Sequence, residues 1–380
     1  MFAGGLGKRE AARRFIRKMG CRLYCISAVL ASLIGLAGAN LDAGDVQALE
    51  GMGQSLIAQA RGQAEAASLR EPPIEVHNDY YVINGEGFAH FRSYTPERDE
   101  AYVAALNNFA ELLPEDVKLY SLLAPTSAAW REEQPFRRLF PNQQELIRSV
   151  WQRLDSRFTS IDIWPTLAEH RDEYLYFRTD HHWTAQAGYL AYRQAALAMG
   201  LSPVGLENYH LQDAGVDYLG SIYGATGSSS LIPNADRIYY YQLPYVVKYT
   251  YWDNQGRPHE SKGLYKAWWL DQPNKYAFFM GGDLPYIKLE MPEGFGNGRR
   301  LALIKDSYAN TIIPFLTAHY QEIYVIDPRN SAFNAVDIIR DNQVDEVLFV
   351  NYARVLCLPE FSQALQGLAS REPVAIQPVP

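Results

Sequence analysis

The sequence predicts an α/β fold built on a parallel β-sheet that helices cover on both faces. Five short apolar segments have the length and composition of buried strands, and stretches with helical periodicity separate them along the chain. A long aromatic segment, at about 209–292, interrupts this alternation and has no strong helical period, so we expect it to be a mainly β insertion. The expected strands of the sheet are 117–124, 158–164, 301–305, 322–326 and 346–350.

The composition is that of a globular protein. Of the 380 residues, 48% are hydrophobic and 21% are charged, and this balance argues against disorder. The 35 basic and 43 acidic residues give a net charge of −8, whereas a protein that wraps nucleic acid normally carries a basic excess. We therefore expect no nucleic-acid partner.

Residues 1–39 have the pattern of a targeting segment. Seven basic residues and one acidic residue precede an apolar run of 17 residues, which ends in Ala37-Gly38-Ala39. Because about 20 apolar residues span a bilayer, a cleaved signal peptide and an uncleaved membrane anchor both fit this run. A buried core helix, the third interpretation, would leave the basic flank without a purpose. With either targeting role, the rest of the chain would lie outside the cytoplasmic membrane.

The remaining chain divides into a linker and one large domain. Residues 40–75 are small and polar, and we expect a linker with one helix at 50–67. The domain at 76–380 opens with a predicted hairpin, because Asn84-Gly85 supplies the positive φ angles of a type I′ turn between two apolar runs. The helices expected within the domain are 96–113, 142–154, 184–200, 308–320, 336–340 and 359–368.

Aromatic residues are concentrated in the insertion. Twelve of the 26 tyrosines and three of the seven tryptophans lie between Tyr209 and Tyr286. Aromatic residues favour strands, which by itself explains the enrichment. A surface on which rings stack against sugars is the alternative explanation. The strands expected here are 237–241, 245–252 and 276–280, with a turn at 254–256.

The densest group of chemically active side chains is the segment 178–184, RTDHHWT. Asp180, His181 and His182 could bind zinc, since imidazole and carboxylate are zinc ligands, but the other histidines form no spaced motif. Asp180 could instead orient His182 as a general base, because residues two apart in a tight loop can face the same side. A purely structural loop is the third interpretation. We expect no metal and no cofactor.

Ser307 is the candidate nucleophile. An apolar strand runs directly into a predicted helix, and Ser307 lies at their junction, at the carboxyl edge of the sheet where ligands bind in open α/β folds. The amino end of the helix would supply N–H groups and a positive dipole end for an oxyanion. An ordinary helix N-cap is the alternative role for this serine.

Together these segments resemble the SGNH (GDSL-type) esterases. Asp306-Ser307 between strand and helix is similar to their nucleophile block, although Lys305 replaces the glycine of that block, and Asp180-x-His182 resembles their acid–histidine block. In ordinary SGNH esterases the serine comes first, whereas here Asp180 and His182 precede it, as in a circular permutation. This order, together with the sequence DHHW at 180–183, resembles the DHHW family and the extracytoplasmic proteins of alginate O-acetylation.

The resemblance implies an SGNH-like three-layer α/β/α domain with a five-stranded parallel sheet. It also implies an acyltransferase in which Ser307 carries the acyl group, His182 is the base and Asp180 orients His182. The residues that the resemblance implies for oxyanion or substrate binding, beside the Ser307 N–H group, are Asn351, Arg329 and Tyr308.

The resemblance further implies partners and a location. The expected function is O-acetylation of a cell-envelope or secreted polysaccharide, beside a membrane-bound O-acyltransferase that exports acetyl groups. The protein would be extracytoplasmic, and attached to the membrane if the first 39 residues remain. A carbohydrate esterase is one alternative, because only the acceptor distinguishes it. A non-catalytic polysaccharide-binding scaffold is the other.

Overall fold

The computed structural model describes residues 72–372 and 374–378. The targeting segment expected at 1–39 and the linker helix expected at 50–67 lie outside the described residues. Within the described part of the chain, no helix is both long enough and apolar enough to cross a membrane.

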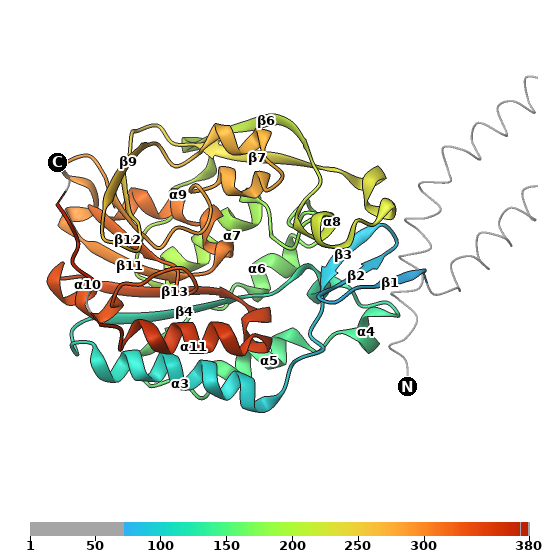
Figure 1. Ribbon diagram of the computed structural model, residues 1–380, viewed down its shortest axis with the longest axis horizontal. Helices are drawn as coiled ribbons and strands as arrows, with labels where there is room; N and C mark the ends of the chain where they lie inside the picture. The colour runs from blue at the N-terminus through green and yellow to red at the C-terminus, as the bar shows by residue number, and fades with distance from the viewer. Residues whose placement is uncertain (1–71, 373, 379–380) are drawn as a thin grey trace, which may run out of the picture. The chain divides into compact units, whose positions relative to one another are not determined.

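One eight-stranded sheet forms the centre of a compact body, which comprises the described residues within 74–131 and 139–378 (Figure 1). Five neighbouring strands are parallel, and they are the five that the sequence predicts. In spatial order the eight strands are β5 (Phe158–Ser160), β4 (Lys118–Ala124), β13 (Glu346–Tyr352), β11 (Arg300–Lys305), β12 (Glu322–Ile326), β10 (Tyr286–Glu290), β8 (Lys248–Trp252) and β9 (Pro258–Lys262).

The insertion extends the sheet beyond the five parallel strands that the sequence predicts, and this extension was not expected. β10 pairs antiparallel with β12, and β8 and β9 continue outward from β10. This pairing satisfies the backbone groups that β12 would expose as an edge strand. Only β6 (His210–Tyr218) and β7 (Asp236–Gln242) form a separate two-stranded sheet.

Helices cover both faces of the sheet. In Figure 1, α3 and α11 lie side by side on one face, and α7 and α9 lie on the other. Asn142 caps α5 and Asn334 caps α10, each by accepting a hydrogen bond from a backbone N–H group of the first turn. Among the described residues, the helices of this body are α3 (Pro96–Leu112), α5 (Gln143–Trp151), α6 (Trp164–Glu169), α7 (Ala185–Ala198), α8 (Ser221–Thr226), α9 (Ile313–Leu316), α10 (Ala335–Asp341) and α11 (Pro359–Leu368). A further short helix, α4 (Phe136–Leu139), lies mostly outside this body.

The hairpin predicted near the start of the domain is confirmed. β2 (Tyr80–Ile83) and β3 (Glu86–Ala89) pair antiparallel around Asn84 and Gly85, whose φ angles are 52° and 74°. β1 (Ile74–Val76) pairs with the free side of β2 and completes a small three-stranded sheet.

Three expected elements differ from the structure. The strand expected at 276–280 is instead a 3₁₀ helix, η5 (Lys275–Phe278), and positive φ angles at Met280, Gly281 and Gly282 prevent an extended chain. The helix expected at 308–320 is divided into η7 (Ser307–Thr311), α9 and η8 (Thr317–His319), because Pro314 has no N–H group to continue the helix. The strand expected at 158–164 ends at Ser160, shortly before α6 begins.

Gly188 in α7 provides a test of the packing between α7 and η7. A Cβ at Gly188 would lie 2.6 Å from Thr311 Oγ1 and 2.8 Å from the Thr311 carbonyl oxygen. Overpacking of about 1–3 kcal/mol should exceed the gain of about 1 kcal/mol in helix propensity. We expect Gly188→Ala to lower the free energy of unfolding in urea titrations. The matched control is Gly224→Ala in α8, where nothing lies within 4 Å of the added carbon, and it should be neutral or stabilising.

Candidate active site

The loop that carries Asp180 is closed at its base and held at its tip. Tyr176 and Trp183 form an antiparallel β-bridge that closes the loop. Asp236, at the start of β7, accepts hydrogen bonds from the Thr179 N–H group at 2.8 Å and from the Thr179 hydroxyl at 2.6 Å. The second strand of the insertion's two-stranded sheet, β7, therefore fixes the backbone directly before Asp180.

The Asp180 carboxylate is buried and accepts four hydrogen bonds. One oxygen accepts from the His182 backbone N–H group at 2.9 Å and faces His182 Nδ1 at 2.5 Å. The other accepts from the Ser221 N–H group at 2.7 Å and from the Tyr218 hydroxyl. Burial by itself raises the pKa of Asp180, but the neighbouring His182 imidazole and these donors hold that pKa well below its usual range. Asp180 is therefore a carboxylate at neutral pH.

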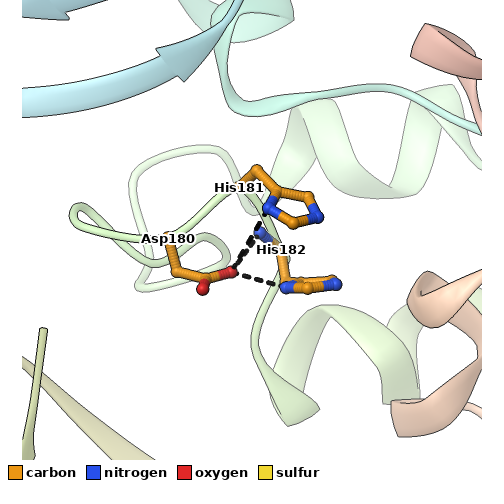
Figure 2. Close-up of side chains that lie close together, drawn as sticks. All are labelled: Asp180, His181 and His182. Carbon is orange, nitrogen blue, oxygen red and sulfur yellow. Dashed lines mark hydrogen bonds and ion pairs between the residues drawn. The ribbon is translucent and has the colours of Figure 1, made fainter. Parts of the chain in front are cut away.

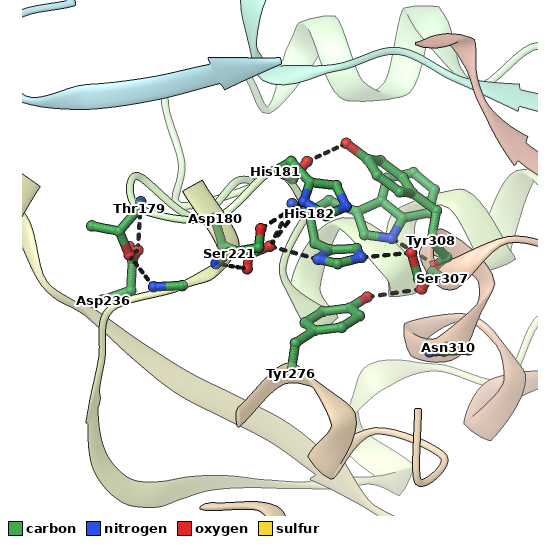
Figure 3. Close-up of polar contacts among 12 residues, drawn as sticks. Thr179, Asp180, His181, His182, Ser221, Asp236, Tyr276, Ser307, Tyr308 and Asn310 are labelled. Atoms are coloured by element: carbon green, nitrogen blue, oxygen red, sulfur yellow. Dashed lines mark hydrogen bonds and ion pairs between the residues drawn. The ribbon is translucent and has the colours of Figure 1, made fainter. Parts of the chain in front are cut away.

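His182 connects this carboxylate to Ser307, which lies 125 residues further along the chain. His182 Nε2 is 2.7 Å from Ser307 Oγ, so Asp180, His182 and Ser307 form one hydrogen-bonded series (Figure 3). A nucleophile bonded to a base, which a third group orients, is the arrangement of nucleophilic catalysis. The structure brings together the three residues that the sequence assigns to this role.

Asp306, and not Ser307, is the N-cap of η7. Its carboxylate accepts hydrogen bonds from Tyr308 N at 2.9 Å and from Tyr352 N at 2.8 Å, while burial raises its pKa to about 6. The Ser307 hydroxyl is thereby left to bond with His182. Because a five-residue 3₁₀ helix follows instead of the expected α-helix, its dipole contributes little to an oxyanion site.

Lys305, at the end of β11, is fully buried. Its ammonium group lies 2.6 Å from Asp283 Oδ1 and 3.3 Å from Asp327 Oδ2. A buried charge is tolerated when it is paired and hydrogen-bonded in this way. Lys305, which replaces the glycine of the SGNH block, therefore pairs with two carboxylates. The next residue, Asp306, has an ordinary φ angle of −108°.

Figure 2 shows the three side chains for which the sequence left metal binding open. Asp180, His181 and His182 each offer a ligand atom, and these atoms lie within 4.8 Å of one another. Both nitrogens of His182 already face Asp180 and Ser307, which suits proton transfer. His181 Nδ1 lies 2.6 Å from Ser221 Oγ, and burial together with the neighbouring His182 lowers the pKa of His181 to about 3. His181 is thus a neutral ring that bonds to the first residue of α8, outside the loop.

The residues assigned to oxyanion or substrate binding differ in their surroundings. Asn351 Oδ1 accepts a hydrogen bond from the Tyr102 hydroxyl at 2.9 Å, and its Nδ2 is buried with no hydrogen-bond partner among the described residues. The Arg329 guanidinium binds both Asp327 oxygens and one oxygen of Asp283. The buried Tyr308 donates from its hydroxyl to the carbonyl of His181, at 2.6 Å. Among these three residues, Asn351 has a buried donor that is unused.

Two tyrosines of the insertion contact the catalytic candidates, and neither was predicted from the sequence. Tyr218, the last residue of β6, donates to Asp180. Tyr276, in η5, stacks on the His182 ring and donates to the Ser307 carbonyl. The only signal for them in the sequence is the general enrichment in aromatic residues, which does not single out two tyrosines among twelve.

Solved structures of other proteins are similar to this chain. The crystal structure of a DHHW family protein from Eubacterium siraeum is 25% identical, covers 78% of this chain and 98% of its own, and has a TM-score of 0.70. Bacillus cereus PatB1, solved with a sulfonyl adduct, is 21% identical over 76% of this chain and 98% of its own, with a TM-score of 0.64. The O-acetyltransferase domain of Pseudomonas putida AlgJ is 10% identical over 78% of this chain and 99% of its own, with a TM-score of 0.41.

The resemblance to the DHHW family is confirmed by a comparison with family models. No curated protein matches the chain. A family model described as DHHW protein matches residues 66–326, which is more than half of the chain and includes the segment 180–183. The protein therefore belongs to the DHHW family.

Proposed function

We propose that this protein is an extracytoplasmic O-acetyltransferase that moves an acetyl group, through a serine acyl-enzyme, onto a hydroxyl group of a cell-envelope or secreted polysaccharide. The observation that carries the proposal is the continuous series of hydrogen bonds from Asp180 through His182 to Ser307. The resemblance of the segments around His182 and Ser307 to the alginate O-acetylation proteins supports the acetyl group and the glycan acceptor.

In the first half-reaction, Ser307 Oγ attacks the carbonyl carbon of the acetyl donor, and its proton passes to His182 Nε2. The electron pair of the C=O double bond moves to the carbonyl oxygen. The Ser307 N–H group and Asn351 Nδ2 would stabilise the resulting oxyanion, since the Asn351 donor has no other partner among the described residues. When the tetrahedral intermediate collapses, the donor's leaving oxygen takes the proton from His182, and acetyl-Ser307 remains.

In the second half-reaction, a sugar hydroxyl gives its proton to His182 and attacks acetyl-Ser307. The ester bond to Ser307 breaks, and Ser307 Oγ recovers a proton from His182. Asp180 stabilises the imidazolium in both half-reactions and keeps the imidazole in the tautomer that presents Nε2 to Ser307. If water replaces the sugar, the same steps make the protein a carbohydrate esterase.

The proposal includes a location and a partner. The basic and apolar pattern of residues 1–39 supports export, with the catalytic domain outside the cytoplasmic membrane. A membrane-bound O-acyltransferase would supply the acetyl groups, because an extracytoplasmic enzyme needs a donor on its own side of the membrane. No cofactor is required for either half-reaction.

The acceptor decides between the candidate functions. The protein from residue 40 onward would be incubated with 4-nitrophenyl acetate, with and without candidate oligosaccharides, and all products would be analysed by mass spectrometry. We expect an acetyl adduct on Ser307 and acetylated oligosaccharide. Acetate as the only product with every acceptor would instead indicate an esterase. An absence of any adduct or turnover would favour the binding scaffold.

Replacement of the nucleophile or the base should abolish turnover. We expect Ser307→Ala and His182→Ala each to remove acetate release from 4-nitrophenyl acetate. The double variant should lose little more, because triad members act as a unit. Since Asp306 caps η7, Ser307→Ala should also unfold at nearly the wild-type temperature. Ser362→Ala is a matched control, because it removes a buried serine hydroxyl from α11. Full activity in Ser307→Ala would refute the assignment of the nucleophile.

Removal of the Asp180 charge should slow the reaction without unfolding the loop. Asp180→Asn favours the wrong imidazole tautomer, so we expect kcat to fall by up to ~10⁴-fold. Tyr218→Phe removes one of the four hydrogen bonds to Asp180 and should cause a much smaller loss. Both rates would be measured as acetate release at neutral pH. Equal losses in the two variants would contradict the role of Asp180 in setting the tautomer.

A further inference from the structure

The imidazole of His182 is covered on one face by a tyrosine ring of the insertion. The ring centroids of Tyr276 and His182 are 3.6 Å apart, and the ring planes differ by only 6° (Figure 3). The two hydrogen bonds of His182, to Asp180 and Ser307, lie at its ring edge. Bonds at the ring edge restrain a tilt of the imidazole out of its plane only weakly. The stacked Tyr276 ring restrains this tilt.

The hydroxyl of Tyr276 reaches the nucleophile residue. It donates a hydrogen bond to the backbone carbonyl of Ser307, at 3.1 Å. Burial, with the charge of Asp180 as a further cause, raises the pKa of Tyr276 well above its usual value, so the hydroxyl remains protonated and a donor. One side chain therefore contacts both the base and the residue that carries the nucleophile.

Tyr276 is placed for these contacts and not for contact with a sugar. Only 3% of the residue is exposed, and Phe177 and Phe279 pack around it with ring centroids 6.2 and 5.3 Å away. A platform for a glycan needs an open ring face, which Tyr276 does not offer.

We propose that Tyr276 is a positioning residue of the active site, which holds the His182 imidazole and the Ser307 backbone in register for proton transfer. The proposal rests on the catalytic function proposed above. When Ser307 gives its proton to His182, the ring becomes an imidazolium, and the face of an aromatic ring attracts a cation at this distance. The contact between Tyr276 and His182 is thus stronger when His182 is an imidazolium than when it is neutral. Interactions of that kind raise kcat rather than lower KM.

The test separates the stacked ring from the hydroxyl. Tyr276→Phe keeps the ring and removes the hydrogen bond to Ser307, and Tyr276→Leu removes both. Tyr286→Leu is the matched control, because Tyr286 is a buried tyrosine of the same insertion that stacks on Trp252, with ring centroids 4.9 Å apart. The melting temperature of each variant would be measured first, and an assay temperature would be chosen at which all variants are folded.

Two rates would be measured at that temperature. The first is sulfonylation of Ser307 by phenylmethanesulfonyl fluoride, followed by mass spectrometry. That reaction joins Ser307 Oγ to sulfur and releases fluoride, while the proton passes to His182. The second is acetate release from 4-nitrophenyl acetate, as separate kcat and KM values. The sulfonylation needs neither an acetyl donor nor a glycan, so it reports on Ser307 even if the proposed acetyl transfer fails.

We expect Tyr276→Leu to lower the sulfonylation rate and kcat by about tenfold to thirtyfold, with KM nearly unchanged. Tyr276→Phe should stay within about threefold of wild type. Tyr286→Leu should lower the melting temperature without lowering either rate.

Several results would overturn the proposal. They are wild-type rates in Tyr276→Leu, an equal loss in Tyr286→Leu, or a rise in KM alone, which would indicate a substrate contact. Wild-type sulfonylation no faster than that of His182→Ala would also overturn it. If Tyr276→Leu does not fold, Tyr276→Met takes its place, and failure of both to fold would assign Tyr276 to the core. Loss of acetyl transfer with intact, Tyr276-dependent sulfonylation would refute the proposed acetyl function and support this inference.

Discussion

The buried carboxylate of Asp180 is the constraint on which the rest of the site depends. A charge without water is costly unless donors surround it, and here the donors come from its own loop and from the segment 218–221. That segment must approach closely, and Gly220 permits it, because a Cβ there would lie 2.3 Å from Asp180 Cβ. Satisfying one carboxylate therefore brings the insertion against the catalytic loop.

A second buried charge organises the other half of the site. Lys305 ends β11 beneath the sheet edge, and its pairing with Asp283 and Asp327 joins the insertion and the end of β12 to the strand that carries the nucleophile. Asp306 then connects η7 to β13 through Tyr352 N. Ser307 is thus presented by a junction that is held from both neighbouring strands, which suits a nucleophile that must keep its distance to His182.

The insertion serves both the sheet and the site. Its strands β10, β8 and β9 extend the parallel sheet beyond β12, while Tyr218 and Tyr276 reach the catalytic residues. Few of its aromatic rings are exposed, and hydroxyls such as that of Tyr249, which donates to the Met280 carbonyl, bond within the fold. Packing therefore explains most of the aromatic enrichment. Trp268 differs, since it is 59% exposed and stacks on Trp269.

The sequence by itself determined the parallel strands, the hairpin and the three residues of the Asp180–His182–Ser307 series, because short apolar runs, an Asn-Gly turn and a DHHW segment are local patterns. It did not determine the antiparallel extension, the broken helix after Ser307, or the contacts of Arg329. Tertiary structure decided these, since strand pairing and ion pairs depend on partners that are distant in sequence. Tyr276 illustrates the reason. The aromatic residues around it favour a strand, but Tyr276 lies in a 3₁₀ helix that packs against His182 and is followed by a turn with positive φ angles.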